Sequence, residues 1–519
     1  MLFNSFVFIF AFLPLALAAA FAVSRWRAAG MKLALVILSL AFYAWAGPRQ
    51  LPLLVASLAF NFAVGELIRR ALKAGRSGTV AALLAVGVAA DVALLVWFKY
   101  ARFAAVNLDS AFGLGIPAPH VVFLLAISFF TFQEIAYLVD TARGETTRTG
   151  ALDFALFFTF FPKLIAGPIV RWREMVPQQQ GRRFGALHGR DLMVGLVMFA
   201  MGLFKKTVIA DTLSPYVNQL FTAAAGHGDP TFAAAWLAAI AFTFQVYFDF
   251  SGYSDMAIGL GRMFGLKLPL NFHSPFRAPS IIDYWRRWHM TLQRFVVTYI
   301  FQPLSLPLNR MAARRGLAVW PAFFLAIGAP IFLTFVVLGV WHGAGWTFAV
   351  FGVMHGVYVV VNEAWRERGK RVRRKRRRGG LATPAPGRAE RFGYHALTLL
   401  AVIVANVMFR CLTVGDAVSM WKGMAGLAGF AGPVPGLDWG LAAALALSVV
   451  LVFFLPNTQQ IMGAWDPAFN WREWKTAAPP PIAWRWKPSA AGIVFAGAAL
   501  FFGVMFIQSG QAVFLYFNF

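Results

Sequence analysis

Long apolar segments separated by short polar stretches run along the whole chain. A helix needs about 20 apolar residues to cross a bilayer, and most of these segments approach that length. Because a helix satisfies its backbone groups within one segment, the pattern predicts an all-α polytopic membrane protein. Apolar segments lie at residues 2–23, 31–47, 51–68, 79–98, 192–204, 232–248, 317–341, 346–362, 394–410, 439–455 and 490–508, and the one at 79–98 carries Asp91.

Two further apolar segments are interrupted by polar residues, glycine and proline. Residues 121–139 carry Gln133 and Glu134 in their interior, and residues 154–170 carry Lys163 and two prolines. Proline removes a helical hydrogen bond, so a straight helix is not expected over 154–170. Irregular backbone at membrane depth is tolerated where protein buries it or where it lines a cavity. We expect a re-entrant or broken segment here, with an interfacial loop as the alternative, and about 11 to 13 membrane segments in total.

Positive charges set the expected orientation of the chain. Arg25 and Arg27 follow the first apolar segment, and Arg69, Arg70 and Lys73 follow the third. Since cytoplasmic loops are enriched in Lys and Arg, both termini are expected outside. The first segment ends in an alanine run that is typical of signal-peptide cleavage. No positive charge precedes it, however, so we expect an uncleaved span.

The composition agrees with a membrane protein. Of the 519 residues, 59% are hydrophobic and 13% are charged, and the mean hydropathy is +0.65. The net charge of +26 would suggest nucleic-acid binding in a soluble protein. Here the basic bias of cytoplasmic loops and their attraction to anionic lipids explain it better. Membrane lipids, and no nucleic acid, are therefore the expected partners.

A basic cytoplasmic loop is expected at residues 366–391. Eight of the nine residues from Lys370 to Arg378 are Lys or Arg, and a Gly- and Pro-rich stretch follows them. Such a segment fixes its side of the protein in the cytoplasm. Docking of an acidic carrier protein or of an acyl nucleotide is the alternative interpretation.

One histidine lies between two apolar segments. His342 follows the segment at 317–341 and precedes the one at 346–362. Ionisable groups at membrane depth are costly, and they mark function more often than packing. A buried neutral imidazole accepts a proton from a hydroxyl group, as the general base of an acyl transfer does. We therefore expect His342 to be a catalytic base, in a cavity walled by Trp341 and Trp346.

His289 is the expected partner of His342. It lies in a long amphipathic stretch, roughly 256–316, that mixes Trp285 and other aromatic residues with arginines. A segment at the membrane interface has this character. His355 comes thirteen residues after His342, about 20 Å along one continuous helix, so direct proton sharing between these two is not expected. A packed core histidine is an equal interpretation of His355.

Two aspartates flank a Ser-Gly-Tyr sequence that suggests a turn. Asp249 and Asp255 would either orient a histidine or cap helix starts, and the two interpretations weigh equally. The sequence contains no HxxxH or HExxH spacing, so no metal site is expected. It also lacks the GxSxG motif of Ser-His-Asp hydrolases.

Several long motifs in order resemble those of the membrane-bound O-acyltransferase (MBOAT) superfamily, in particular its alginate O-acetyltransferase group. The resemblance covers essentially the whole chain. One departure follows the WRRWH motif, where FVVTYIFQPLSLPL at 295–308 replaces an Arg-Asp-Tyr-like run and a Pro-Leu-Gly-Gly turn. The matching motifs are ISFFTFQ at 127–133, FPKLIAGPIV at 161–170, GLFKK at 202–206, DFSGYSDMAIGLGRMF at 249–264, YWRRWHMTL at 284–292, WHGA at 341–344, MHG at 354–356, LPNTQQIM at 455–462 and FLYF at 514–517.

The resemblance implies a single MBOAT domain over residues 1–519, with helices around a central channel and a catalytic core at 119–362. It implies an O-acyltransferase of the bacterial inner membrane in which His342 and His289 are the functional histidines. An acyl group, most simply acetyl, is expected to pass from a cytoplasmic thioester, acetyl-CoA or a carrier-protein thioester, with no bound cofactor. The expected acceptor is an exported polysaccharide such as alginate, and a periplasmic partner protein is expected to complete the transfer. Candidate channel residues are Trp341, Trp346, Trp285, Asp249 and Asp255.

Three alternatives stay open on the sequence alone. In the first, the acceptor of the acyl group is peptidoglycan or another cell-envelope glycan. In the second the chain is a proton-coupled transporter or flippase, which should show repeat symmetry and paired membrane carboxylates; the sequence shows neither clearly. In the third it is a non-catalytic scaffold of an export complex, against which the intact histidine motifs argue.

Overall fold

The computed structural model describes residues 1–24, 28–121, 124–148, 150–181, 184–186, 188–226, 228–382, 385–430, 434, 436–507 and 515. Every regular element within these residues is a helix, which confirms the all-α prediction. Eight helices are long and apolar enough to cross a membrane, and three shorter apolar helices accompany them. Arg25, Arg27, His227 and most of the C-terminal FLYF motif lie outside the described residues.

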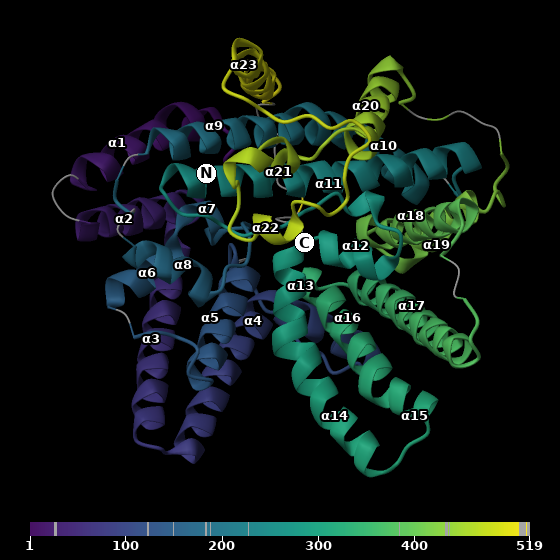
Figure 1. Cartoon of the computed structure of the whole chain (residues 1–519), viewed down its shortest axis with the longest axis horizontal. Coiled ribbons are helices and arrows are strands. Elements are labelled where there is room, and N and C mark those ends of the chain that lie inside the picture. Colours follow the sequence, from purple (N-terminus) through teal and green to yellow (C-terminus); the bar gives the residue numbers. More distant parts are fainter. Residues whose placement is uncertain are drawn as a thin grey trace.

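The first five helices pack largely in chain order. α1 packs on α2 and α3 on α4, and α5 packs on both α3 and α4. The α3–α4 hairpin projects from the body of the molecule (Figure 1). The predicted segment at 121–139 is wrong in its start, because the helix begins only at Ile127. The bounds are η1 Phe8–Phe12, α1 Leu13–Ser24, α2 Ala28–Ala46, η2 Pro48–Gln50, α3 Leu51–Lys73, α4 Ser77–Phe112 and α5 Ile127–Ala142.

The segment predicted to be broken is indeed broken. α6 ends at Thr159, α7 is a single turn that contains Pro162, and residues 165–170 are irregular but buried. Burial in protein is what irregular backbone in a membrane protein requires. The bounds in this region are α6 Ala151–Thr159, α7 Phe161–Leu164, α8 Trp172–Gln180, α9 Gly189–Phe204, η3 Lys205–Ala210 and α10 Asp211–Gly226.

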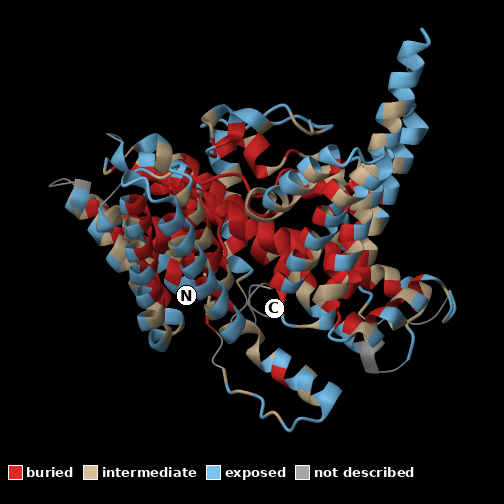
Figure 2. Ribbon diagram, turned by 90° about the horizontal axis from the view of Figure 1, so that it is seen from below, coloured by how far each residue is buried: buried red, intermediate tan, exposed pale blue. Residues whose placement is uncertain are grey.

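Helix α11 (Phe232–Met263) is the centre of the packing. It contacts α9, α10, α18 and α19, and every residue from Ala241 to Met263 is buried. Figure 1 shows it crossing the molecule beside α9, and Figure 2 shows the buried residues gathered in the middle of the protein. The helix continues beyond the predicted span at 232–248, so the amphipathic stretch expected from residue 256 begins later than predicted.

Short helices replace the predicted interfacial stretch. A loop with one 3₁₀ turn follows α11, and α12 and α13 are only seven residues each. α14 and α15 then project on the same side as the α3–α4 hairpin (Figure 1). The bounds are η4 Pro275–Arg277, α12 Ile281–Arg287, α13 Met290–Val296, η5 Val297–Phe301, α14 Gln302–Arg314, α15 Val319–Phe323 and η6 Phe324–Gly328.

Two long helices form a hairpin after this region. α16 (Ala329–His342) and α17 (Trp346–Arg378) pack on each other, and α17 also packs on α18 (Arg388–Arg410). The predicted loop at 366–391 is wrong for its first part, because α17 continues through the basic run. Arg and Lys are good helix formers, so a run of them extends an existing helix readily.

The C-terminal helices cover α9 and α11. α23 packs on α9, and α19 and α20 pack on α11. The bounds are α19 Val414–Met424, α20 Trp439–Val449, η7 Val450–Phe454, α21 Thr458–Ile461, η8 Gly463–Trp465, α22 Trp471–Trp474 and α23 Ala490–Met505.

Candidate active site

His342 is the last residue of α16 and lies where the chain reverses into α17. Extended backbone at Gly343 and Gly345 makes the reversal. The imidazole is buried among aromatic rings. The ring centroid of Trp341 lies 5.0 Å from that of His342, and those of Phe409 and Phe351 lie 5.2 and 6.1 Å away. Helices α16, α17 and α18 therefore enclose the candidate base.

His289 lies between α12 and α13 in a left-handed backbone conformation. Its φ of 43° is unusual for a residue with a Cβ atom, and such strain gathers at functional sites. Its Nδ1 lies 3.0 Å from Oδ1 of Asn271, which also accepts a hydrogen bond from Thr291 Oγ1 at 2.8 Å. Because Oδ1 is an acceptor, Nδ1 carries the hydrogen of His289, and Nε2 is the nitrogen that can accept a proton.

The two candidate histidines meet at one indole ring. The ring centroid of Trp341 lies 6.3 Å from that of His289 and 5.0 Å from that of His342. Phe129 and Phe132 of α5 pack on the same indole, at 5.7 and 5.3 Å. The structure thus places His289, Trp341 and His342 together, although they come from separate parts of the chain.

Two neighbouring residues of α4 hold the end of α16. Lys99 Nζ donates to the carbonyl oxygens of Trp341 at 2.5 Å and His342 at 3.1 Å. The Tyr100 hydroxyl donates to the carbonyl oxygen of Val340 at 2.7 Å. The last carbonyls of a helix lack partners within the helix, and a cation there also offsets the helix dipole. Lys99 therefore fixes the backbone that carries His342.

Sequence reasoning did not find Lys99. A Lys-Tyr pair at the end of an apolar segment is typical of an ordinary membrane-interface anchor. Its contact with residues more than 240 positions later depends on tertiary packing, and no local pattern signals it.

The expected distance between His342 and His355 is wrong, because the two residues are not on one continuous helix. The hairpin brings both imidazoles against Phe351, whose ring centroid lies 6.1 Å from that of His342 and 4.5 Å from that of His355. His355 Nδ1 accepts a hydrogen bond from Trp285 Nε1 at 3.1 Å. Trp285, a predicted channel residue, therefore contacts His355, which fits a packed core histidine.

Neither interpretation of Asp249 and Asp255 holds, because both residues lie inside α11 and not at a turn. Asp249 pairs with Lys206 at 2.6 Å, and Asp255 pairs with Lys205 at 2.7 Å. Side chains of Thr458 and Gln459 also donate to Asp255. These aspartates join α11 to η3 and α21. The Ser-Gly-Tyr sequence does not form a turn, because its glycine, Gly252, lies where α11 packs closely on Gly202 of α9.

Trp346 does not contact the ring of His342 in the described structure. Its side chain is 60% exposed, and its Nε1 donates to Asn107 Oδ1 at 2.8 Å. Trp341, with phenylalanines from α5, α17 and α18, packs around the two histidines, and Trp346 does not. Among the residues that the structure describes, no three His, Cys, Asp or Glu side chains gather as ligands for a metal ion.

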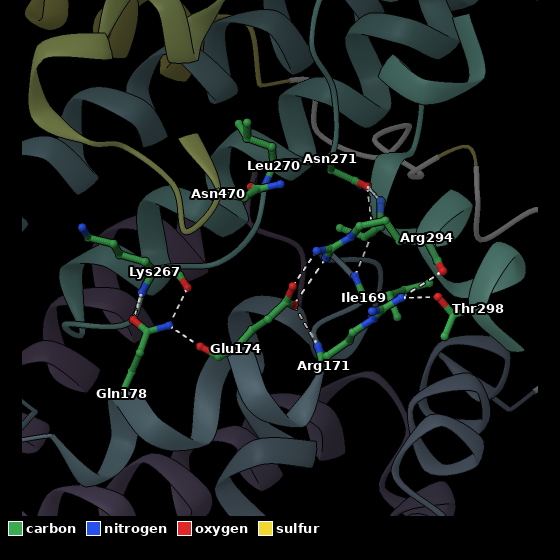
Figure 3. A network of polar contacts seen from close by, with 11 residues as sticks. Ile169, Arg171, Glu174, Gln178, Lys267, Leu270, Asn271, Arg294, Thr298 and Asn470 are labelled. Atoms are coloured by element: carbon green, nitrogen blue, oxygen red, sulfur yellow. Dashed lines mark hydrogen bonds and ion pairs between the residues drawn. The ribbon is translucent and has the colours of Figure 1, made fainter. Parts of the chain in front are cut away.

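A cavity of about 430 Å³, here called the arginine-lined cavity, lies close to His289, because Met290 is one of its lining residues. Figure 3 draws polar contacts beside this cavity, in which the Arg294 side chain and the Arg171 backbone both bind Glu174. Arg294 Nη1 lies 2.5 Å from Glu174 Oε1, and the backbone N–H of Arg171 donates to Oε2 at 3.0 Å. The lining residues are Arg173, Glu174, Arg286, Met290, Gln293, Arg294, Phe469, Asn470, Glu473 and Trp474.

Comparisons with known proteins agree with this fold. The peptidoglycan O-acetyltransferase of Helicobacter pylori is 36% identical over 83% of this chain and 80% of its own length. The probable alginate O-acetylase AlgI of Azotobacter vinelandii is 38% identical over 70% of this chain and 69% of its own length. The teichoic acid D-alanyltransferase of Streptococcus thermophilus is 26% identical over 50% of this chain and 61% of its own length.

The sequence profile of the membrane-bound O-acyltransferase family matches residues 120–385. This range contains His289, His342 and the ring cluster around Trp341. The relatives from Helicobacter pylori and Azotobacter vinelandii are named as an O-acetyltransferase and a probable O-acetylase. The chain belongs to the membrane-bound O-acyltransferase family and is a multi-pass membrane O-acyltransferase.

Proposed function

We propose that this enzyme moves an acyl group, most simply acetyl, from a cytoplasmic thioester across the bacterial inner membrane for O-acetylation of an exported polysaccharide such as alginate. His342 acts as the general base. The observation that carries the proposal is the placement of His342 and His289 against one buried indole, that of Trp341.

The proposed reaction needs one proton acceptor. The acceptor hydroxyl oxygen forms a bond to the acyl carbon, and the carbon–sulfur bond breaks. The imidazole of His342 takes the hydroxyl proton and passes it to the leaving thiolate, so no proton is gained or lost overall. His289 supports this step as a hydrogen-bonding or acid–base partner, with its tautomer held by Asn271. The surrounding phenylalanines keep water away, which strengthens electrostatic effects on the developing oxyanion.

The arginine-lined cavity supports a donor that carries phosphate. Arg173 and Arg286 line it beside the Arg294–Glu174 pair, and guanidinium groups bind phosphate with paired hydrogen bonds. Met290 lies both in the lining and directly after His289. Acetyl-CoA and a carrier-protein thioester both bear phosphate next to their thiol arm, and either fits this chemistry.

Peptidoglycan is the second candidate acceptor. The relative from Helicobacter pylori, named for peptidoglycan, covers a larger part of this chain than the Azotobacter vinelandii relative named for alginate. In either case we propose that a periplasmic partner protein completes the transfer to the polymer.

The test is the ester-linked acetyl content of the exported polysaccharide and of the peptidoglycan, in cells that produce wild-type protein or His342→Ala. His120→Ala is the matched control, because His120 is an exposed histidine. Loss of acetyl esters from one polymer, with equal amounts of each protein in the membrane, supports the proposal and identifies the acceptor. Unchanged acetylation of both polymers in His342→Ala refutes it, and loss of the polymer itself indicates export.

A further inference from the structure

A buried polar group lies within α3, α4 and α5, outside the site described above. It consists of Ser57 and Asn61 of α3, Asp91 of α4 and Glu134 of α5. Asp91 is 2% exposed, and Asn61 and Glu134 are fully buried. Two carboxyl groups therefore lie together inside helices of which two are long and apolar enough to cross the membrane.

Hydrogen bonds join these four residues. Ser57 Oγ lies 2.9 and 3.0 Å from the two oxygens of Glu134. Asn61 Nδ2 donates to Asp91 Oδ1 at 2.9 Å and to the carbonyl oxygen of Ser57 at 3.2 Å. Ser57 and Asn61 lie one turn apart on α3. The two carboxyl groups are therefore bound by neighbouring side chains on one stretch of α3.

The group contains more acceptors than donors. Ser57 has one hydroxyl hydrogen, which serves only one oxygen of Glu134 at a time. Among the described residues, Asp91 Oδ2 and Asn61 Oδ1 have no hydrogen-bond partner, and both atoms are buried. Buried acceptors without donors are costly, so the site requires a further positive or donating species.

Basic side chains do not supply that species. Among the described residues, the carboxyl oxygens of Asp91 and Glu134 accept hydrogen bonds from the neutral side chains of Asn61 and Ser57. Lys163 of α7 donates to the side-chain oxygen of Gln133, the residue next to Glu134. Its amine is therefore used by Gln133. Within the described residues, no Lys or Arg pairs with Asp91 or Glu134, so the two charges cannot both persist in this low-dielectric position.

The existing hydrogen bonds favour a proton over a metal ion. Hard cations need about six or more oxygen ligands, and the four side chains supply six only if the carboxyl groups give up their hydrogen bonds from Asn61 and Ser57. Ser57, Asn61, Asp91 and Glu134 all lie in regular helix, where backbone carbonyl groups are used in the helical ladder. We propose that Asp91 and Glu134 form a proton-binding site in which the two carboxyl groups hold one proton between them. The bound proton supplies a donor at the carboxyl pair, where Asp91 Oδ2 has no partner among the described residues, and joins α4 to α5.

This proton site goes beyond acyl transfer, because the transfer itself neither consumes nor releases protons. The sequence showed no paired membrane carboxylates, since Asp91 and Glu134 lie in separate segments. The structure pairs them, which is one of the two features expected of a proton-coupled protein. The pair lies in α4 and α5, the helices that also provide Lys99 and Phe132 to the surroundings of His342.

Infrared spectroscopy of the purified full-length protein at neutral pH tests the proposal. A protonated carboxylic acid has a carbonyl band that is separate from carboxylate bands and shifts in D₂O. The difference spectrum between wild type and the double variant Asp91→Asn/Glu134→Gln should show this band with the intensity of one protonated carboxyl group per protein molecule. Each single variant should lose it, because the remaining carboxylate then receives the new amide donor. Asp153→Asn is the control, because Asp153 pairs with Lys32 at 2.5 Å and should contribute no such band.

Two results would overturn the proposal. One is the absence of the band from wild type, which means that both acids are ionised; stabilisation of the protein against heating by Na⁺ but not by choline would then show a metal-cation site. The other is full retention of the band in either single variant, which means that the acids do not share a proton. Gel filtration and circular dichroism establish that each variant is folded, and Ser57→Ala, which keeps both acids, should retain the band.

Discussion

At the scale of single residues, the site depends on two histidines held in different ways. His342 is fixed through its backbone at the end of α16, and His289 is fixed through its ring by Asn271. The sequence predicted this pair because one histidine lies between apolar segments and the other lies in an amphipathic stretch rich in aromatic residues. It failed for Asp249 and Asp255, because their lysine partners lie on another helix and nothing near them in the chain indicates the pairing.

The left-handed backbone at His289 gives a prediction about stability. Alanine is strained at a φ of 43°, whereas glycine adopts it freely. We expect His289→Gly to be more stable than His289→Ala by about 1 kcal/mol, although both lack the imidazole and should be slowed equally in acyl transfer. Thermal unfolding in detergent, with acyl transfer measured in parallel, checks this. An alanine variant at least as stable as the glycine variant would contradict the backbone assignment.

The hydrogen bond from His289 to Asn271 gives a prediction about activity. Asn271→Leu keeps the side-chain size but removes the acceptor, and a lost hydrogen bond of about 1.4 kcal/mol corresponds to about 10-fold in rate. The measurement is acyl-transfer rate in a double-mutant cycle with His289→Ala. If Asn271 acts through His289, the double variant is no slower than His289→Ala alone. Additive losses would mean that Asn271 has a separate role.

At the scale of elements, contacts between helices determine where the site residues lie. The apolar pattern predicted most helices, including the broken segment at 154–170, because length and proline content are local properties. The sequence predicted that the chain breaks between the segments at 317–341 and 346–362, but not how α16 and α17 pack on each other. How closely the two helices pack depends on residues far apart in the chain, and this is why the spacing of His342 and His355 was wrong.

The cap on α16 is predicted to matter for turnover. Lys99→Met removes the cation from the last carbonyl groups of α16, which is worth about 1–2 kcal/mol, or about 10-fold in rate. We expect kcat to fall while KM for the donor stays constant. Tyr100→Phe loses one neutral hydrogen bond and is expected to show a smaller effect. A change in KM alone would assign Lys99 to donor binding.

Helices α9 and α11 are predicted to tolerate no added bulk at their crossing. A Cβ atom at Gly202 would lie 2.7 Å from the carbonyl oxygen of Gly252, and small residues permit such contact in membrane helices. Gly202→Val should destabilise the protein by about 1–3 kcal/mol. Gly497→Val is the control, because a Cβ there meets nothing within 4 Å. Equal thermal stability of the two variants would contradict the packing.

At the scale of the whole molecule, a buried centre around α11 is surrounded by helices whose outer faces are apolar and exposed. Most motifs of the family resemblance that the structure describes lie in this centre or beside it, and for this reason the sequence predicted the fold class well. It did not predict the arginine-lined cavity, whose residues come from 173–174, 286–294 and 469–474. Only the folded chain brings these three stretches together.

The cavity gives a prediction about the donor. Arg286→Ala should raise KM for a phosphate-bearing thioester by about 10-fold, since a charged hydrogen bond contributes about 1.5–3 kcal/mol, and kcat should change little. Arg388→Ala, at the exposed start of α18, is the control. Steady-state kinetics with acetyl-CoA and with a carrier-protein thioester show which donor loses affinity. Unchanged KM for both would exclude the cavity as the donor site.

The central claim is that His342 is the base for acyl transfer, and single-turnover transfer in reconstituted membranes tests it most directly. Wild type, His342→Ala and His120→Ala are loaded with a labelled thioester, and free thiol and new ester are measured together. We predict that His342→Ala slows both by about 10²–10⁴-fold, the usual contribution of a general base, while His120→Ala keeps the wild-type rate. Transfer by His342→Ala at the wild-type rate would contradict the account.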